Sequence, residues 1–362
     1  MAMKTGRNYK IGGTVIVPPD PDPIPTKITT TIKFASAPVS ASVARTTRKF
    51  RKKNWLSLEW DDASVGSVSG LPILNNAFYT DGCGNNINYR AALAINGAYE
   101  QTGVEYTYTE PGRATVTNMQ QFINAGWDIS DHGYYHDPVG FGESMTAMES
   151  TIKMRDYVKR LLKYWVRSKV VPTNYPGHAD AAKAIGYLYS TSQGTFDSLT
   201  PEWMFAPPGN YANVPADFGA LRRDFTDAWA ADFEANKTIF NNLFASTNKF
   251  FRLGSHTIDV PAFQSYIDYL VANSNDQLLV ATTREVLEYR EINTMPFTQS
   301  LIGDTLTIET DLTNLDQKNR WKDQCFDLTS DKQVVSVTVS VGTASFNAAT
   351  GLVNTFFETK QW

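Results

Sequence analysis

The sequence predicts an α/β fold built on a parallel sheet, open or closed into a barrel, with a small antiparallel β domain after it. Strand-like apolar runs alternate with amphipathic stretches from residue 54 to about residue 292, which is the order of βα units in a parallel sheet. After residue 292 the runs are strand-like, with polar turns between them. Hydrophobic residues make up 42% of the chain, enough for a large core.

The first 53 residues precede this pattern. Residues 1–25 end in alternating proline and aspartate, which predicts an extended arm or linker. Residues 26–53 form an N-terminal strand segment whose Thr-, Val- and Ser-rich part is a candidate to pack with the C-terminal domain. The segment ends in RTTRKFRKK, with six basic residues between Arg45 and Lys53. One interpretation is a solvated edge strand protected by its charge; the other is a contact for an acidic partner or an anionic glycan.

Residues 54–292 carry the predicted α/β domain. Strands are expected at NWLSLEW, INYRAALAING, WDISDH, KVVPTNY, FFRLGSH and QLLVATT. Helices are expected at VTNMQQFINAG, ESMTAMESTIKMRDYVKRLLKYWVRS, ADAAKAIGYLY, ADFEANKTIFNNLFAS, VPAFQSYIDYLVANS and REVLEYRE. Residues 293–362 are predicted to form a β-rich C-terminal domain without a catalytic role, since their strands lack clustered His, Asp and Glu.

Composition excludes several classes of function. The net charge of −4 argues against nucleic acid as a partner. No run of about 18 apolar residues exists, so no membrane span is expected. Cys83 and Cys325 are the only cysteines, which argues against a disulfide framework or a thiolate zinc site. The 12% of aromatic residues fits a carbohydrate cleft and a large β-rich core equally well.

All four histidines lie at or just after a predicted strand end, where parallel barrels place their catalytic groups. His132 and His136 are four residues apart and can face one divalent ion. Asp61 and Asp62 end the first predicted strand, and two adjacent buried acids are costly without a cation. A metal site is one interpretation; histidines that cap a helix or lie on its surface are the other.

The order of several motifs resembles the polysaccharide deacetylases of carbohydrate esterase family 4. The motifs are LEWDDAS, NAGWDISDHGYYH, VVPTNY, RLGSH and LLVATTREVLEY, and they span about residues 54–292. The resemblance implies an irregular (β/α) barrel of the polysaccharide deacetylase type. It also implies a metal-dependent hydrolase that removes acetyl groups from an acetylated polysaccharide or oligosaccharide, with one divalent ion, expected to be zinc.

The resemblance further implies a role for each matching residue. Asp62, His132 and His136 would bind the metal, and Asp61 would be the general base. His256 would be the general acid.

Substrate contacts are also implied or expected. A backbone N–H near Tyr175 would share the oxyanion, as in the family. Trp203 is a candidate to line the cleft or to be ordinary core. Asp81, on a Gly/Asn-rich loop, is a candidate substrate contact, although most such loops are only turns. His178 is interpreted as a surface histidine or as a substrate contact.

Three positions depart from the family pattern. Ala63 stands where the family has glycine after the two acids, and Gly133 replaces a hydroxyl residue. The third motif lacks the arginine that orients the base, so Arg252 and Arg90 are the candidates to replace it. A catalytically weak glycan-binding or structural protein is therefore an alternative function, and a barrel hydrolase acting on amides is another.

The expected substrate lies outside the cytoplasm, yet the N-terminus lacks the apolar core of a signal peptide. Three interpretations stay open: a chain trimmed of its signal, a cytoplasmic enzyme for a small acetylated sugar, or a component of a phage particle. In the last case the N-terminal arm is a candidate attachment point to a larger assembly.

Overall fold

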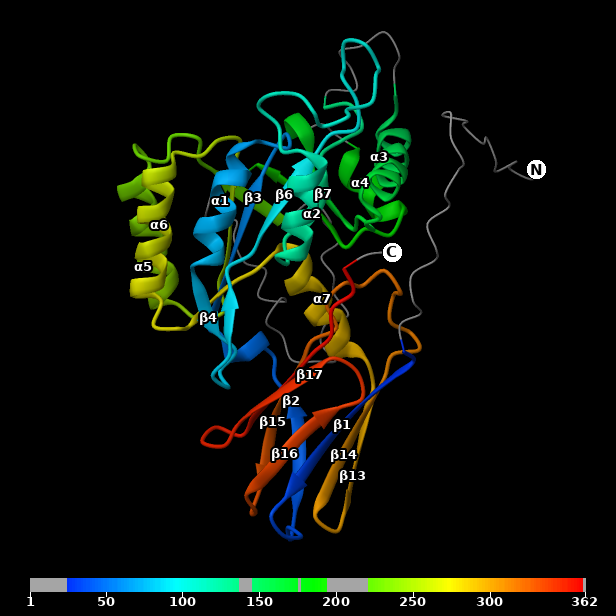
Figure 1. The fold of residues 1–362 in the computed structure, drawn as a ribbon, viewed down its shortest axis with the longest axis vertical. Helices are drawn as coiled ribbons and strands as arrows, with labels where there is room; N and C mark the ends of the chain where they lie inside the picture. The colour runs from blue at the N-terminus through cyan, green and yellow to red at the C-terminus, as the bar shows by residue number, and fades with distance from the viewer. Residues whose placement is uncertain (1–24, 137–144, 175–176, 194–220, 361–362) are drawn as a thin grey trace, which may run out of the picture.

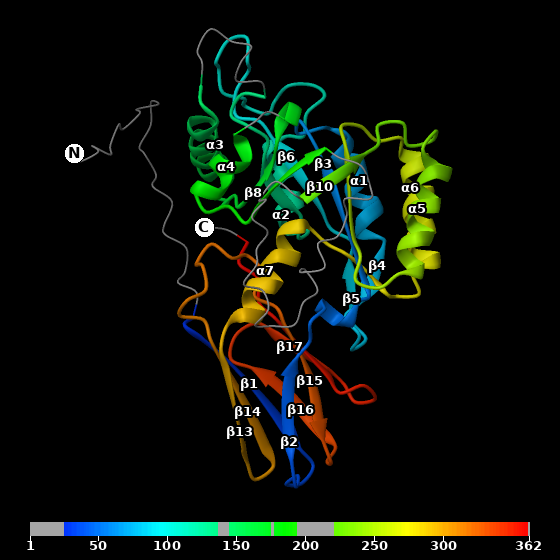
Figure 2. The ribbon, with the colours of Figure 1, turned by 180° about the vertical axis from the view of Figure 1, so that it is seen from behind.

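The computed structural model describes residues 25–136, 145–174, 177–193 and 221–360. A barrel surrounded by helices lies at one end of the molecule and two antiparallel sheets lie at the other, as Figure 1 shows from one side and Figure 2 from behind. No helix in the described part of the chain combines the length and the apolar character needed to cross a membrane.

The barrel is a sheet of eight parallel strands in the order β11-β10-β9-β8-β7-β6-β3-β12. Strand β11 also pairs with β3, from Phe250↔Trp55 to Ser255↔Trp60, and this pairing closes the sheet. The strands are β3 (Asn54–Trp60), β6 (Ala91–Ile95), β7 (Asp128–Asp131), β8 (Ser168–Val170), β9 (Tyr189–Gln193), β10 (Leu221–Phe225), β11 (Phe250–Ser255) and β12 (Leu278–Val280). The predicted (β/α) barrel with additional antiparallel sheets is therefore confirmed.

Helices cover the outside of the barrel (Figure 1). Trp60 stacks on Trp127 with ring centroids 5.4 Å apart and meets Phe263 of α6 edge to face, which joins strand and helix layers in one core. The helices are α1 (Gly66–Asn75), α2 (Val116–Asn124), α3 (Ala147–Leu162), α4 (His178–Ala184), α5 (Phe233–Ala245), α6 (Val260–Asn273) and α7 (Thr283–Thr294).

Several elements differ from the sequence prediction. The strands β9 and β10 and the helix α1 were not expected. Helix α1 contains Pro72 and two glycines, which weaken the helical signal. The helix expected at 179–189 ends at Ala184, and Gly186 adopts a left-handed φ of 82° before β9 begins.

The antiparallel sheets draw strands from both ends of the chain. Strand β1 (Lys27–Phe34) lies between β14 and β16, and β2 (Ala41–Arg45) pairs with β15. An apolar cluster that includes Ile32, Val43 and Phe326 fills the space between the two sheets. The other strands are β13 (Phe297–Ile302), β14 (Thr305–Asp311), β15 (Gln324–Ser330), β16 (Val334–Val339), β17 (Thr343–Asn347) and β18 (Leu352–Phe356).

The basic stretch between Arg45 and Lys53 is not a solvated edge strand, so that interpretation was wrong. The ammonium group of Lys49 is buried and lies 2.6 Å from both Glu285 of α7 and Asp323. Burial alone would lower the pKa of Lys49, but these two carboxylates outweigh it and raise the pKa. The acidic partner of this stretch is the chain itself, at the junction of barrel and sheets.

Helix α7 is buried on nearly every side and lies between the barrel and the sheets (Figures 1 and 2). Its charges are neutralised locally: Arg284 Nε donates to Glu288 at 2.8 Å. Glu288 in turn accepts the backbone N–H groups of Arg320 and Trp321 at 2.9 and 2.8 Å. This polar helix can therefore be buried, because its charged side chains have ion-pair and hydrogen-bond partners, including the backbone of residues 320–321.

Candidate metal centre and active site

Three side chains converge at the C-terminal ends of the barrel strands. Asp62 follows β3, His132 follows β7, and His136 lies one turn further on. Nε2 of His132 is 3.6 Å from Oδ1 of Asp62, and Nε2 of His136 is 3.8 Å from the same oxygen. One ligand atom from each residue lies within 4.8 Å of the other two. The residues expected from the sequence to bind the metal are therefore brought together.

The tautomer of His132 follows from its surroundings. Its Nδ1 lies 2.9 Å from the carbonyl oxygen of Val170, which can only accept, so Nδ1 carries the hydrogen. Nε2 then has a free lone pair, and this buried atom has no hydrogen-bond partner. An orphaned, buried imidazole nitrogen facing a carboxylate is the arrangement of a metal ligand.

His136 has a carboxylate near its other ring nitrogen, beyond hydrogen-bond distance. Its Nδ1 lies 3.7 Å from Oε1 of Glu100, and its Nε2 faces Asp62. A carboxylate on the far side of a ligating imidazole orients the ring and strengthens it as a ligand. The sequence analysis did not single out Glu100, because it lies far from the motifs in an irregular loop.

Asp61 is a buried carboxylate next to this cluster, one residue beyond the paired end of β3. Arg223 of β10 donates to both of its oxygens, with Nη1 at 2.7 Å from Oδ1 and Nη2 on Oδ2. Burial would raise the pKa of Asp61, but Arg223 and then His132 outweigh it and lower the pKa. Asp61 is therefore ionised and fixed in orientation.

His256 is placed on the opposite side of Asp62. It follows Ser255, whose register partner is Trp60, so His256 and Asp61 leave neighbouring strand ends together. Nδ1 of His256 donates to Asp227 at 2.9 Å, and its Nε2 lies 3.8 Å from Oδ2 of Asp62. The Asp227 carboxylate fixes the imidazole so that Nε2 faces the site.

Both histidines of the cluster, Asp61, Arg223 and His256 line one pocket of about 250 Å³. Thr173, Val171 and Phe225 complete its wall. The ring of Phe225 packs on His256 with centroids 4.6 Å apart, so an apolar surface lies directly beside the imidazole. The pocket is lined by Asp61, His132, His136, Val171, Thr173, Arg223, Phe225 and His256.

The backbone after the paired acids is left-handed. Asp62 and Ala63 have φ values of 57° and 52°, a region that costs a residue with a Cβ about 1–2 kcal/mol. The same turn lets the backbone N–H of Ala63 donate to Ala94 at 2.9 Å. Glycine would adopt this turn without the steric penalty, so Ala63 carries a strain that positions Asp62.

We expect Ala63→Gly to leave the free energy of unfolding unchanged or to raise it by up to about 1 kcal/mol. Relief of the left-handed strain offsets the loss of one buried methyl, worth about 0.8 kcal/mol. Chemical denaturation measures the difference. The buried Ala94 of β6 is the control, and Ala94→Gly should destabilise by about 1 kcal/mol or more. Equal destabilisation by Ala63→Gly and Ala94→Gly would show that the backbone at Ala63 is not strained.

Gly133 explains the second departure from the family pattern. Its φ is 86°, and a Cβ there would lie 2.5 Å from the carbonyl oxygen of Tyr135. Its N–H donates to Oδ1 of Asp131 at 2.7 Å. The tight turn between His132 and His136 therefore requires glycine.

Several expected residues do not reach this pocket. The prediction of Asp81 as a substrate contact was wrong. Its carboxylate accepts hydrogen bonds from Ser345 of β17 at 2.7 Å and from Asn85 at 2.8 Å, so Asp81 attaches its loop to the sheets. His178 was wrongly interpreted as a surface residue, because it is fully buried in α4. That burial, followed by the positive charge of Lys169, lowers the pKa of His178 to about 3.

Neither arginine that was expected to replace the missing arginine of the third motif does so. Arg90 pairs with the buried Glu285 at 2.9 Å, away from the pocket. Arg252 lies inside the barrel, 3.9 Å from Glu59. Arg223 holds the Asp61 carboxylate instead, and neither it nor Asp227 was predicted. Arg223 lies in the short, charged strand LRRDF, and Asp227 follows two residues after the end of that strand. The strand has no strong apolar pattern, and only a strand prediction there would have found these two residues.

Two expected substrate contacts, Tyr175 and Trp203, lie outside the described residues. The backbone N–H expected to share the oxyanion near Tyr175 therefore stays a prediction. Thr173, two residues earlier, does line the pocket, so the chain reaches the site at this point.

No protein-family model and no curated protein matches the chain. Among solved structures it is similar to a family 4 acetyl xylan esterase from Clostridium thermocellum in complex with a cobalt ion, at 12% identity and a TM-score of 0.38, over 64% of this chain and 89% of that one. It is similar to a chitin deacetylase from the fungal pathogen Colletotrichum lindemuthianum at 13% identity and a TM-score of 0.40, over 67% and 89%.

The chain is also similar to the Puue allantoinase at 13% identity and a TM-score of 0.44, over 70% of this chain and 95% of that one. Two of these solved structures, a family 4 acetyl xylan esterase and a chitin deacetylase, are named for activities of the kind that the motif resemblance implies.

Proposed function

We propose that the protein is a metal-dependent hydrolase that removes acetyl groups from an acetylated polysaccharide or oligosaccharide. One observation carries the proposal: the two histidines of a two-histidine, one-carboxylate cluster line one pocket together with an arginine-held Asp61 and an aspartate-held His256. Pure binding requires no such combination of a ligand set with an acid and a base. The acetylated glycan as substrate rests on the resemblance of the motifs.

The residues present fit a divalent ion. Two imidazole nitrogens and one carboxylate oxygen form a ligand set that leaves positions open for water and substrate, and the orphaned Nε2 of His132 points to the same conclusion. Asp62, His132 and His136 would hold the ion, which we expect to be zinc. When bound, such an ion lowers the pKa of water and polarises a carbonyl oxygen.

Asp61 would act as the general base. Its oxygens lie beside the cluster, with Oδ2 3.9 Å from Nε2 of His132, and it is ionised because Arg223 lowers its pKa. It accepts the proton of the water whose oxygen attacks the acetyl carbon. Arg223 keeps the carboxylate oriented during this transfer.

His256 would act as the general acid. Its Nε2 faces the pocket, while Nδ1 donates to Asp227. The imidazolium gives its Nε2 proton to the sugar oxygen or nitrogen as the bond to the acetyl carbon breaks, and acetate leaves. The carboxylate of Asp227 stabilises the charged ring before that transfer.

The alternative, a catalytically weak protein on the same scaffold, was favoured by the missing arginine of the third motif. Arg223 fills that role from another strand, which supports the hydrolase. The experiment is acetate release by the purified protein from a panel of O- and N-acetylated oligosaccharides. Turnover that depends on the divalent ion is expected; no release from any member with the ion bound would contradict the proposal.

Replacing Arg223 by methionine should lower kcat/KM by about 10²-fold and move the acidic limb of the pH profile to higher pH. Burial raises the pKa of Asp61, and without Arg223 the largest opposing effect is gone. Since the base works only when ionised, activity would then be lost at a higher pH as the pH falls.

Arg223→Lys is the matched control because it keeps the positive charge but not the paired contacts. In Arg223→Lys the acidic limb of the pH profile should return close to its native pH, whereas kcat/KM should stay well below the native value. A pH profile identical in the native protein and in Arg223→Met would show that Arg223 does not control the base.

A further inference from the structure

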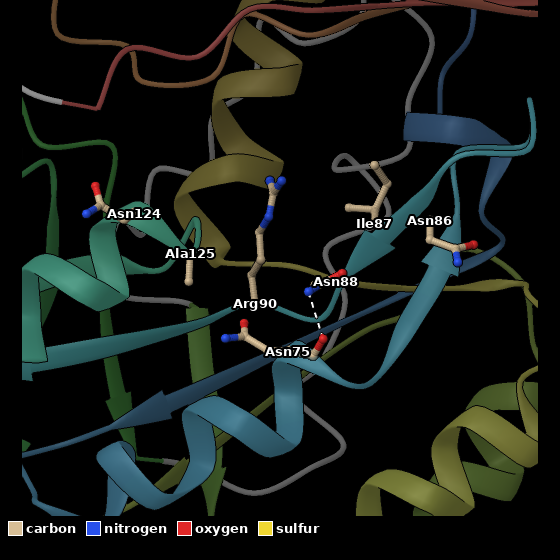
Figure 3. Close-up of a pocket in the computed structure, with 7 residues that line it drawn as sticks. All are labelled: Asn75, Asn86, Ile87, Asn88, Arg90, Asn124 and Ala125. Atoms are coloured by element: carbon tan, nitrogen blue, oxygen red, sulfur yellow. Dashed lines mark hydrogen bonds between the residues drawn. The ribbon is translucent and has the colours of Figure 1, made fainter.

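A second pocket lies at the opposite end of the barrel from the candidate metal centre. It has a volume of about 470 Å³ and is formed by the C-terminal ends of α1 and α2, the strand β5 (Asn86–Asn88) and Arg90, just before β6 (Figure 3). The candidate metal centre uses the C-terminal ends of the strands, whereas this pocket lies at the N-terminal end of β6. No step of the proposed hydrolysis uses this pocket.

The wall of the pocket is rich in carboxamides, from Asn75, Asn86, Asn88 and Asn124. Nδ2 of Asn88 donates to the carbonyl oxygen of Asn75 at 2.8 Å (Figure 3), which fixes the orientation of that amide. A carboxamide both donates and accepts, so it can engage two neighbouring hydroxyl groups at once. Four of them around one hollow suit a ligand with many hydroxyls.

The charge of the pocket argues against an anion. The guanidinium of Arg90 is paired with buried Glu285 at 2.9 Å, so its charge is already neutralised. Helices α1 and α2 both end here, and helix C-termini carry partial negative charge. Lys360 donates to the carbonyl oxygen of Asn124 at 2.8 Å, with Glu358 3.8 Å away from the same ammonium. Since the charged groups around the pocket are already paired, a neutral ligand suits it better than an anion.

An exposed aromatic residue pairs in register with one residue of the pocket wall. Phe78 of β4 (Phe78–Thr80) is 46% exposed and is the direct register partner of Asn88. Opposite residues of an antiparallel pair project from the same face, with Cβ atoms roughly 5 Å apart. The ring therefore lies beside the amide of Asn88, and a flat apolar surface next to hydrogen-bonding groups suits the face of a sugar ring.

We propose that this pocket is a second, non-catalytic binding site for a neutral sugar unit. The chemistry of the pocket alone carries this assignment; that the sugar belongs to the same glycan that the candidate metal centre hydrolyses rests on the proposed function. The site would hold the polymer on the protein independently of turnover.

The test uses the full chain carrying His132→Ala, so that hydrolysis cannot consume the probe. Unacetylated tetrasaccharides of xylose and glucose and the tetrasaccharide of N-acetylglucosamine are titrated by calorimetry and by protein NMR. At least one should bind, and Phe78→Ala and Asn124→Ala should each weaken it roughly fivefold to tenfold. Asn273→Ala, at the exposed end of α6, should leave the affinity unchanged.

Asn124 and Phe78 are both exposed, so their variants should fold, and thermal unfolding checks this. Binding that Phe78→Ala and Asn124→Ala leave unchanged would overturn the proposal, and so would no binding at concentrations on the order of 10 mM. Binding present in the native chain but lost in His132→Ala would place the sugar at the metal centre instead. Failure of acetate release from the native chain would overturn the hydrolase alone.

Discussion

Asp61→Asn should reduce acetate release by about 10²- to 10⁴-fold, the usual contribution of a general base, without changing the metal content. The amide is nearly isosteric and can still accept from Arg223, which donates to both oxygens in the native chain, but it cannot take a proton from water. Turnover is measured by acetate release, and the metal by elemental analysis of the same sample.

Asp62→Asn is the matched control, since Asp62 is the acid that faces both Nε2 atoms. It should lose metal and activity together. If Asp61→Asn lost the metal and Asp62→Asn kept it, the roles of the two acids would be reversed. Full activity of Asp61→Asn would remove the general base from the mechanism.

Truncation after Glu291 should leave no soluble, folded barrel, although no described residue of the antiparallel sheets lines the pocket at the candidate metal centre. Lys49 would keep Glu285 but lose Asp323, and Glu288 would lose two backbone N–H groups. A buried charge stripped of its partner costs about 3–5 kcal/mol. Two or three such losses would match the 5–15 kcal/mol by which a whole domain is stable.

Soluble yield and circular dichroism test this result. Lys27→Ala is the control for a charged pair of the same sheets, because Lys27 and Glu309 are 53% and 42% exposed. That variant should change the stability by less than about 1 kcal/mol. A truncated chain that unfolds as cooperatively as the intact one would show that the barrel does not need residues 292–362.

The sequence predicted the site residues that lie close together in the chain. Two acids directly after a strand and two histidines four residues apart reach the same point because parallel strands end at one edge of the barrel. Arg223 could not be predicted in this way, since its contact with Asp61 spans 162 positions. It depends on β10 being a neighbour of β11, which closes onto β3.

The burial of charged side chains could not be predicted from the sequence either. The stretch between Arg45 and Lys53 has the composition of a solvated segment, yet Lys49 and Lys52 are buried. Helix α7 has a mixed polar composition, yet it is buried too. In both cases distant partners, such as Asp323 and the backbone of Arg320, neutralise the charge. Local patterns carry no information about such partners.

Metal stoichiometry of the native chain, His132→Ala and His136→Ala tests the central claim most directly. One divalent ion per native chain is expected, since the three ligand atoms form a single cluster. Each alanine variant should lose the ion under conditions that saturate the native chain, while thermal unfolding of the ion-free proteins remains cooperative. Full retention of the ion by both variants would contradict the site formed by Asp62, His132 and His136.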